Sequence, residues 1–428
     1  MNFIREKANY VIEKAKAKTL KTFNDPIYGF ITVEDELIFE LLEHPYFQRL
    51  RRISQLGLTN LVYSGANHSR FQHTLGAMNL MGSAIAVLRS KGVSIAPSEE
   101  QGAKIAILLH DIGHGPFSHA LENTIVKGIN HERIGMMIME KLNEEFNGKL
   151  DLAISIYKGT YEVKFLHQLV SSQLDTDRLD YLKRDSFFTG VSEGVIGSER
   201  LIKMMTVHED ELVIEAKGVY SLEKFLLARR LMYWQVYLHK TVLSAEFLLM
   251  NILLRARHVY SNNTDLAGSA ALNYFLQEDR VLGESNREEW LSQFVMLDDY
   301  DVLSAIKQWA TSENKVLNEL CNRLINRRLL KTKLLKSPMS ADSLLELQKK
   351  LSHENGWTIE ESAYLVFQKS QTNRAYDAQH ERIKVLYKDG SIQDISEAAS
   401  IFRFASLETE ETKHYLYYPA GFQIDVKC

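Results

Sequence analysis

Apolar residues recur at intervals of three and four over most of the first 260 residues, and this period constrains the fold more than any other feature. It matches the roughly 3.6 residues of one α-helical turn, so each such segment presents one apolar face to a common core. The segments that show it are 35–55, 74–91, 102–111, 132–146, 161–185 and 220–260. With only 6 Pro and 22 Gly in 428 residues, the chain is predicted to be mainly α-helical.

Short stretches interrupt the helical pattern and predict small β-hairpins. Residues 22–33 mix β-branched and aromatic residues with a Pro and a Gly, and 207–215 place a polar turn before a short apolar strand. Residues 382–392 alternate around an Asp-Gly turn, and 414–418 are aromatic and strand-like. We therefore expect two minor hairpins beside the helices and a small strand-containing element near the end.

The pattern divides the chain into three parts, without an internal repeat or a low-complexity tract. Residues 1–260 form the helical core with its N-terminal hairpin. Residues 261–375 are expected to be a helical extension of charged amphipathic helices. Residues 376–428 are expected to be a small α+β element.

Composition narrows the setting in which the protein works. The formal charge of −4 is too close to balance for a general polyanion-binding surface, so a nucleic-acid partner is not indicated. The two cysteines, Cys321 and Cys428, lack metal or redox spacing and fit a reducing compartment, which predicts a cytoplasmic protein. The first 21 residues do not read as a signal peptide, and no apolar run approaches the roughly 20 residues of a membrane span.

Two strong metal ligands end one of the predicted helices. The apolar run 103–109 leads directly into His110 and Asp111, and a Gly-His-Gly-Pro stretch then breaks the helix. A buried imidazole beside a buried carboxylate needs a partner, and a divalent cation satisfies both. An isolated pair of this kind is more often a satisfied core histidine with a capping aspartate. Here, however, His73 and Asp177 lie on two further predicted helices and can complete a metal site.

The order His, His-Asp, Asp resembles the HD superfamily of metal-dependent phosphohydrolases, in which two His and two Asp from separate helices hold one divalent ion. The resemblance implies an HD-type helical core. Longer motifs resemble the bacterial and mammalian SAM-and-HD-domain deoxynucleoside triphosphate (dNTP) triphosphohydrolases over residues 22–260. These motifs are residues 55–57, 70–76, 110–119, 130–132 and 177–185.

The resemblance assigns roles to the matching residues. It implies four metal ligands, His73, His110, Asp111 and Asp177, for one divalent ion whose identity among Mn, Fe, Zn, Ni, Co and Mg stays open. It implies three catalytic residues, with His131 as general acid for the leaving oxygen, alongside His114 and Asp111. The substrate would be bound by Gln55, Leu56, Arg70, His119, Arg178, Tyr181, Asp185, Arg229 and Tyr237.

Helical spacing brings several of these residues onto common faces. Arg70 precedes His73 by three residues, which suits a guanidinium beside a metal ligand. One stripe carries a metal ligand, a phenol and a carboxylate: Asp177, Tyr181 and Asp185. A second stripe, which without the resemblance reads as a solvated helix face, consists of Arg229, Tyr233 and Tyr237. By resemblance, the Tyr237 ring would lie against the sugar and leave no room for a ribose hydroxyl.

The chain departs from the mammalian pattern in places that bear on specificity. Leu238 and Tyr233 stand where the mammalian enzyme has a glutamine and a histidine, and Arg178 replaces a lysine. Near a regulatory groove, Gln48 and Arg51 match the relatives. Glu43 replaces the aspartate that reads guanine there, so the resemblance does not carry a guanine-nucleotide activator over to this chain.

Three functions follow from these observations. The leading hypothesis is hydrolysis of a dNTP to deoxynucleoside and triphosphate by a water activated at the metal. A second keeps the metal but changes the phosphoester, to a nucleoside monophosphate, a cyclic dinucleotide or a guanosine alarmone. A third is a non-enzymatic nucleotide-sensing or nucleic-acid-binding oligomer. The resemblance also implies a homo-oligomer, either a dimer or a tetramer.

Overall fold

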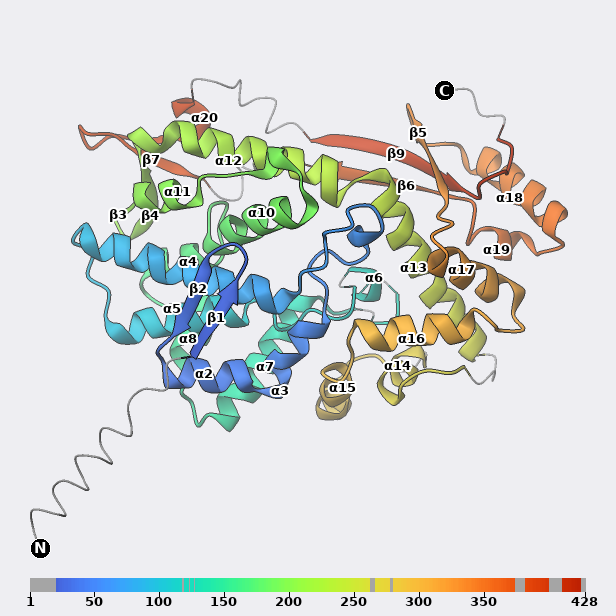
Figure 1. The fold of residues 1–428 in the computed structure, drawn as a ribbon, viewed down its shortest axis with the longest axis horizontal. Helices are drawn as coiled ribbons and strands as arrows, with labels where there is room; N and C mark the ends of the chain where they lie inside the picture. The colour runs from blue at the N-terminus through green and yellow to red at the C-terminus, as the bar shows by residue number, and fades with distance from the viewer. Residues whose placement is uncertain are drawn as a thin grey trace, which may run out of the picture.

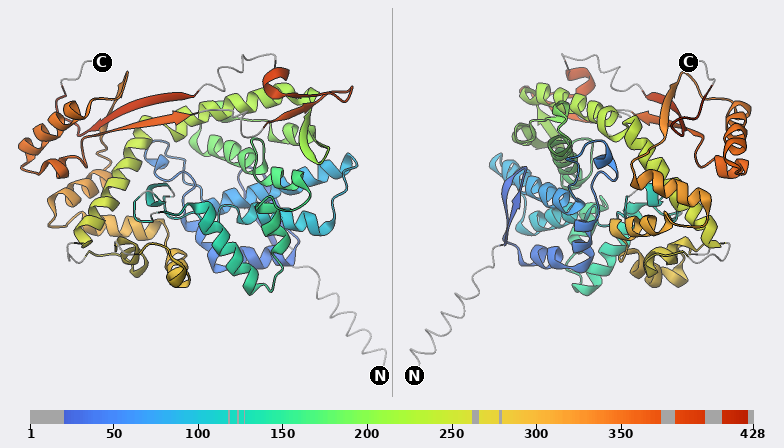
Figure 2. Two further views of the ribbon diagram at one scale, coloured as in Figure 1. Left: turned by 180° about the vertical axis from the view of Figure 1, so that it is seen from behind. Right: turned by 45° about the vertical axis from the view of Figure 1, so that its right-hand side comes forward.

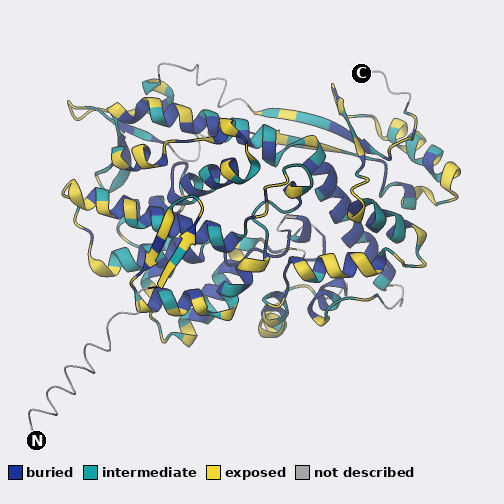
Figure 3. Ribbon diagram, in the orientation of Figure 1, coloured by how far each residue is buried: buried dark blue, intermediate teal, exposed yellow. Residues whose placement is uncertain are grey.

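The computed structural model describes residues 21–117, 119–122, 124–126, 128–261, 266–277, 280–373, 382–399 and 410–424, and the side chain of His119 falls outside it. Helix α4 (Arg70–Ser90) packs against α5 (Pro97–Leu109) and α10 (Thr176–Thr189), while α8 (Asp151–Tyr157) and α9 (Lys164–Val170) cover α5 (Figure 1). Buried residues face the space between these helices and exposed residues lie outside (Figure 3). The prediction of a mainly helical core is confirmed.

Side-chain caps begin the helices that carry the candidate site. Asn130 accepts a hydrogen bond from the amide of Arg133 at 3.0 Å, and Asp175 accepts one from the amide of Arg178 at 2.7 Å. Gly190 ends α10 with a φ of 74°, a left-handed conformation that glycine adopts without strain. The other elements of this half are α2 (Glu36–Glu43), α3 (Pro45–Gln48), η1 (Arg49–Arg52), η2 (Thr59–Leu61), α6 (His119–Glu122), α7 (His131–Glu145), η3 (Ser192–Gly194), α11 (Ser198–Met204), η4 (Ala216–Gly218) and α12 (Val219–Met232).

Two antiparallel hairpins lie where the sequence predicts them. Strands β1 (Lys21–Asp25) and β2 (Gly29–Val33) form the first, on the outer side of α4 (Figure 1). Strands β3 (Met205–His208) and β4 (Glu211–Glu215) form the second. Their two turn residues have φ values of 49° and 60°, a positive pair that suits a tight hairpin turn.

Helices make up most of the described chain between residues 261 and 375, together with strands β5 and β6. The π-helix η5 (Tyr233–Tyr237) directly follows α12, and α13 (Lys240–Ser261) then leads into the extension. The later helical elements are α14 (Ala270–Leu276), η6 (Glu284–Asn286), α15 (Arg287–Phe294), α16 (Asp299–Trp309), α17 (Lys315–Ile325), α18 (Ala341–Asn355), α19 (Ile359–Ser362) and α20 (Ile395–Ala398). Cys321 on α17 is buried and free, and Cys428 lies outside the described residues.

The strands near the C-terminus join two different sheets. Strand β7 (Lys384–Leu386) pairs in parallel with β4 and antiparallel with β8 (Ile392–Asp394). Strand β9 (Glu411–Tyr418) lies between β5 (Lys331–Leu335) and β6 (Phe367–Asn373), and this sheet reaches from the end of α12 towards α18 (Figures 1 and 2). Periodicity missed β5 and β6 because both are mainly polar and mostly half-buried or exposed, so neither shows an alternating apolar face. The three-part division of the chain stays a prediction.

The extension is anchored to the core through a buried arginine. The Arg49 guanidinium donates to the carbonyl of Leu297 at 3.1 Å and to that of Ile112 at 2.9 Å, and it lies over the Phe294 ring. Burial lowers the pKa of Arg49 to about 10, so the group stays charged at neutral pH. One side chain therefore ties α15 and α16 to the loop that follows Asp111. None of the described helices is both long and apolar enough to span a membrane.

We predict that Arg49→Ala destabilises the protein by about 3 kcal/mol, because two buried carbonyls lose a charged donor. Chemical denaturation measures the free energy of unfolding. The matched control is Arg52→Ala, in which a 45% exposed side chain loses its ion pair with Asp298, for an expected cost of about 1 kcal/mol or less. Equal losses in the two variants would contradict the anchoring role.

Candidate active site

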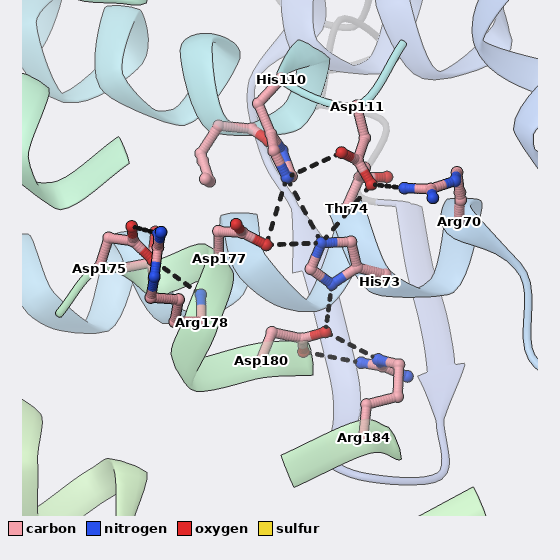
Figure 4. Close-up of polar contacts among 12 residues, drawn as sticks. Arg70, His73, Thr74, His110, Asp111, Asp175, Asp177, Arg178, Asp180 and Arg184 are labelled. Atoms are coloured by element: carbon pink, nitrogen blue, oxygen red, sulfur yellow. Dashed lines mark hydrogen bonds and ion pairs between the residues drawn. The ribbon is translucent and has the colours of Figure 1, made fainter. Parts of the chain in front are cut away.

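Three imidazole and carboxylate groups from three helices converge at the centre of the core. His73 lies on α4, His110 directly follows α5, and Asp177 lies in the first turn of α10 (Figure 4). His73 Nε2 is 3.4 Å from His110 Nε2 and 3.0 Å from Asp177 Oδ1, and His110 Nε2 is 3.4 Å from the same oxygen. The three donor atoms thus face one another, with separations that a single cation can bridge.

The outer nitrogens of both histidines are held in ways that turn Nε2 inward. His73 Nδ1 lies 2.8 Å from Asp180 Oδ2, and His110 Nδ1 lies 2.6 Å from the carbonyl oxygen of Ile107. Both acceptors lack a proton, so each Nδ1 carries a hydrogen and each Nε2, once it has lost its own proton, presents a lone pair to the centre. This donor set, with one carboxylate, fits a divalent metal ion.

A chain of buried charges fixes Asp180 behind His73. The Arg184 guanidinium binds both oxygens of Asp180, at 2.9 and 3.0 Å (Figure 4). It also binds Asp25, at 2.8 Å. Gly76 permits this approach, because a Cβ there would lie 2.1 Å from Asp180 Oδ1. The sequence reading missed Asp180 and Arg184, although their spacing of four residues on one helix was a usable signal.

The electrostatics of the centre favour positive charge. Burial lowers the pKa of His73, but hydrogen bonds to Asp177 and Asp180 outweigh burial and raise the value to about 10. Burial likewise opposes ionisation of Asp177, yet His110 and His73 hold its pKa below the ordinary value. In the protein without metal a proton on His73 balances the carboxylates, and a bound cation would displace that proton.

Asp111 borders the centre and binds neighbouring cationic and neutral donors. Its Oδ1 is 3.4 Å from His110 Nε2, and its Oδ2 is 3.8 Å from His73 Nε2 and 2.5 Å from Arg70 Nη1. His114 Nε2 lies 3.2 Å from Oδ1. Burial and the nearby Arg70 hold the pKa of His114 well below its usual range, so this ring is neutral and donates to Asp111. Of the four expected metal ligands, Asp111 is the one whose two carboxylate oxygens are already bound by side chains outside the ligand set, Arg70 and His114.

His131 stacks on His114, beside the cluster of His73, His110 and Asp177. The rings of His114 and His131 lie parallel at 3.9 Å, and His131 Nδ1 is 3.0 Å from Glu122 Oε1. Glu122 was not among the residues expected from the sequence, because nothing in the motif spacing singles out this carboxylate. The side chain of His119, which was expected to bind substrate, lies outside the described residues.

The cluster opens into a cavity of about 410 Å³. Most of the expected substrate-binding residues line it: Gln55, Leu56, Arg70, Arg178, Tyr181, Asp185 and Tyr237. Glu132, Tyr157 and Tyr233 line it too, and of these only Tyr233 was singled out for its position. Burial and the Asp185 carboxylate raise the pKa of Tyr237 well above its usual value, so its hydroxyl is protonated. It donates to Asp185 Oδ2 at 2.7 Å.

Arg229 does not line this cavity but lies close behind it, where its charge acts on the Tyr181 phenol. Its Nε and Nη1 atoms are buried without a hydrogen-bond partner, and so is Nε of Arg178. The expected regulatory residues are engaged elsewhere: Arg51 Nε donates to Gln48 at 2.9 Å, and its guanidinium lies 3.6 Å from the Phe71 ring centre. Neither Gln48 nor Arg51 lines this cavity.

Comparisons with known proteins agree with this geometry. The HD domain model matches residues 70–183, and the HD associated region model matches residues 196–267. A solved phosphohydrolase from Bacteroides thetaiotaomicron is 49% identical, with a TM-score of 0.90, over 93% of this chain and 99% of its own.

Two further relatives match most of this chain, and one of them carries the name of an activity. The uncharacterized protein YwfO of Bacillus subtilis is 35% identical over 95% of this chain and 93% of its own. A protein of Dictyostelium discoideum, named deoxynucleoside triphosphate triphosphohydrolase SAMHD1 homolog, is 28% identical over 77% of this chain and 64% of its own. The convergent cluster lies inside the HD match, and the chain belongs to the HD-domain phosphohydrolases, related to the SAMHD1-like dNTP triphosphohydrolases.

Proposed function

We propose that this protein hydrolyses dNTPs to deoxynucleoside and triphosphate. The observation that carries the proposal is the composition of the cavity beside the donor cluster. One part of the lining consists of the donor cluster with Arg70 and Arg178, which suits phosphate groups. The rings of Tyr181 and Tyr237 and the amide of Gln55 suit a sugar. A nucleoside phosphate matches both kinds of lining.

His73, His110 and Asp177 would hold the divalent ion, with Asp111 as the fourth ligand. Such an ion lowers the pKa of bound water and polarises a phosphoryl oxygen. In the proposed reaction water attacks the α-phosphorus, a new P–O bond forms, and the bond to O5′ breaks. Arg70 lies against Asp111 and is placed to stabilise charge on the phosphoryl oxygens. The metal identity, among Mn, Fe, Zn, Ni, Co and Mg, is open.

His131 is the proposed general acid. It lines the cavity, and Glu122 accepts from its Nδ1, which fixes the ring orientation. The proton would pass to O5′ of the leaving deoxynucleoside. His114 stacks on the His131 ring and donates to Asp111, so it holds both groups in register.

Unpartnered guanidinium nitrogens support a polyphosphate rather than a single phosphate group. Buried donors without acceptors are costly, and a bound anion would satisfy that of Arg178, which lines the cavity. The charge of Arg229 behind Tyr181 would attract the same anion. The Dictyostelium relative's name supports the same substrate class. We also propose a homo-oligomer, and exposed Tyr300, Leu303 and Ile325 on α16 and α17 provide apolar surface for it.

We predict that each active dNTP yields tripolyphosphate and deoxynucleoside in equal amounts when a divalent metal is present. Mass spectrometry of products from dNTPs and other phosphoesters, with metals varied, measures this. Orthophosphate or pyrophosphate as the product would reject the reaction. Turnover of a monophosphate, cyclic dinucleotide or alarmone alone would favour the alternative phosphohydrolase. Nucleotide binding without any turnover would favour the sensing oligomer.

We predict that Asp177→Asn lowers turnover by about 100-fold or more, because the amide cannot replace an anionic metal ligand. Metal content by elemental analysis should fall in parallel, while circular dichroism stays unchanged. Asp342→Asn, on the exposed first turn of α18, is the matched control and should retain both metal and activity. Full turnover in Asp177→Asn would rule out the proposed metal centre.

We predict that Arg229→Gln raises KM for a dNTP by about 10-fold or more, because the cavity wall at Tyr181 loses a buried positive charge that would attract the polyphosphate. The neighbouring Arg230→Gln is the control, since the Arg230 guanidinium instead lies 3.5 Å from Glu411 on β9. Steady-state kinetics on one dNTP compares them. An unchanged KM for Arg229→Gln, or equal effects of both changes, would contradict a phosphate-binding role for Arg229.

A further inference from the structure

A buried histidine outside the His73, His110 and Asp177 cluster lies behind Asp185, a residue of the cavity wall. The His68 side chain is fully buried, and its Nε2 lies 2.8 Å from Asp185 Oδ1. Its ring stacks on Phe188 at 4.5 Å with an interplanar angle of 17°. The sequence reading passed over His68, because it precedes the Arg70 motif and shows no spacing to Asp185.

The contact fixes a carboxylate that faces the cavity. Asp185 Oδ1 is bound by His68, and Oδ2 accepts from the Tyr237 hydroxyl at 2.7 Å. Each oxygen is therefore held by one donor, so the carboxylate cannot rotate about its terminal bond. A carboxylate oxygen has capacity for a further bond, and a fixed anionic acceptor on a cavity wall takes a donor from the ligand.

His68 also holds a second segment of the cavity wall. Its carbonyl accepts from the amide of Gln55 at 3.0 Å, and Ser54 and Ser69 form an isolated antiparallel bridge beside it. Gly65 packs tightly against the end of α10, because a Cβ there would lie 2.4 Å from the carbonyl oxygen of Phe188. The loop that carries His68 is thus packed tightly against α10, so a substitution of His68 would change the position of the Asp185 carboxylate.

The hydrogen-bond roles are set by the partners. Asp185 already accepts a hydrogen bond from Tyr237 and offers His68 only an acceptor oxygen, so His68 Nε2 carries the hydrogen. The other nitrogen, Nδ1, is buried without a partner, which is compatible with a bare acceptor atom. His68 therefore donates one hydrogen bond, from Nε2, to Asp185.

We infer that His68 is a positioning residue that holds Asp185 as the acceptor for a substrate hydroxyl. It thereby enables the site to distinguish a sugar that carries a 3′-hydroxyl from one that lacks it. This inference rests on the proposed function, and it adds a basis for substrate selection to that site. His68 itself does not line the catalytic cavity and acts through Asp185.

The test compares two amide variants with two substrates. In His68→Gln the amide nitrogen reaches the position of Nε2, whereas in His68→Asn it falls short, so the two variants differ in reach to Asp185. The substrates are a dNTP and its 2′,3′-dideoxy counterpart. Steady-state release of tripolyphosphate gives KM and kcat for each pair, and melting temperatures monitor folding.

For the wild-type enzyme, KM should be about 10-fold or more higher for the dideoxy substrate, since a charged hydrogen bond is lost. In His68→Asn the KM for the dNTP should rise towards the dideoxy value, while kcat and the dideoxy KM change little. His68→Gln should restore the discrimination. A loss of equal size on both substrates, or full discrimination retained in His68→Asn, would overturn the inference, as would His68→Gln failing like His68→Asn while folded.

Binding separates this inference from the proposed reaction. Calorimetry with non-hydrolysable α,β-imido analogues of the same two nucleotides, with metal present, needs no turnover. If wild type releases no tripolyphosphate yet binds the hydroxylated analogue more tightly, and His68→Asn loses that preference, the reaction is wrong and the role of His68 stands. If wild type binds both analogues equally, the role of His68 is wrong whatever the reaction.

Discussion

The buried hydrogen bond between His73 and Asp180 is the interaction on which the active site depends. It fixes the tautomer of His73 and so directs a lone pair towards His110 and Asp177. The Asp180 carboxylate can be buried because Arg184 neutralises it, and Arg184 in turn reaches Asp25 on the N-terminal hairpin. Buried ion pairs therefore connect His73, helix α10 and the hairpin β1–β2. Removing one member of this chain would leave a buried charge without a partner.

The helical extension also supports the candidate site, since it holds the loops around the cavity. Asp299, at the start of α16, accepts from the amides of Ser54 and Phe117, at 2.8 and 3.2 Å. Ser54 precedes Gln55 of the cavity wall, and Phe117 ends the loop that begins at Asp111. Together with Arg49, this carboxylate couples the packing of α16 to the geometry of both loops. The residues beyond 260 therefore help to position the loops of the HD core.

Local patterns and the family resemblance singled out the side chains that the structure brings together as candidate metal ligands. His110 and Asp111 end an apolar helix where a Gly-Pro stretch forces a break, and His73 and Asp177 stand near the starts of periodic segments. By contrast, His68 and Glu122 acquire their roles only through contacts with Asp185 and His131, and no spacing rule encodes such contacts. The pairing of β9 with β5 and β6 was equally hidden, because sheet partners far apart in sequence leave no periodic signal.

By itself the sequence determined the helical class, the two hairpins, and the types and order of the candidate ligands along the chain. These follow from side-chain period and from the chemistry of imidazole and carboxylate, which are local properties. Only the tertiary structure decided which nitrogen of each histidine faces the centre, that Arg70 binds Asp111, and that His68 supports Asp185. Those facts depend on how α4, α5 and α10 pack, and packing sets distances between groups that are remote in sequence.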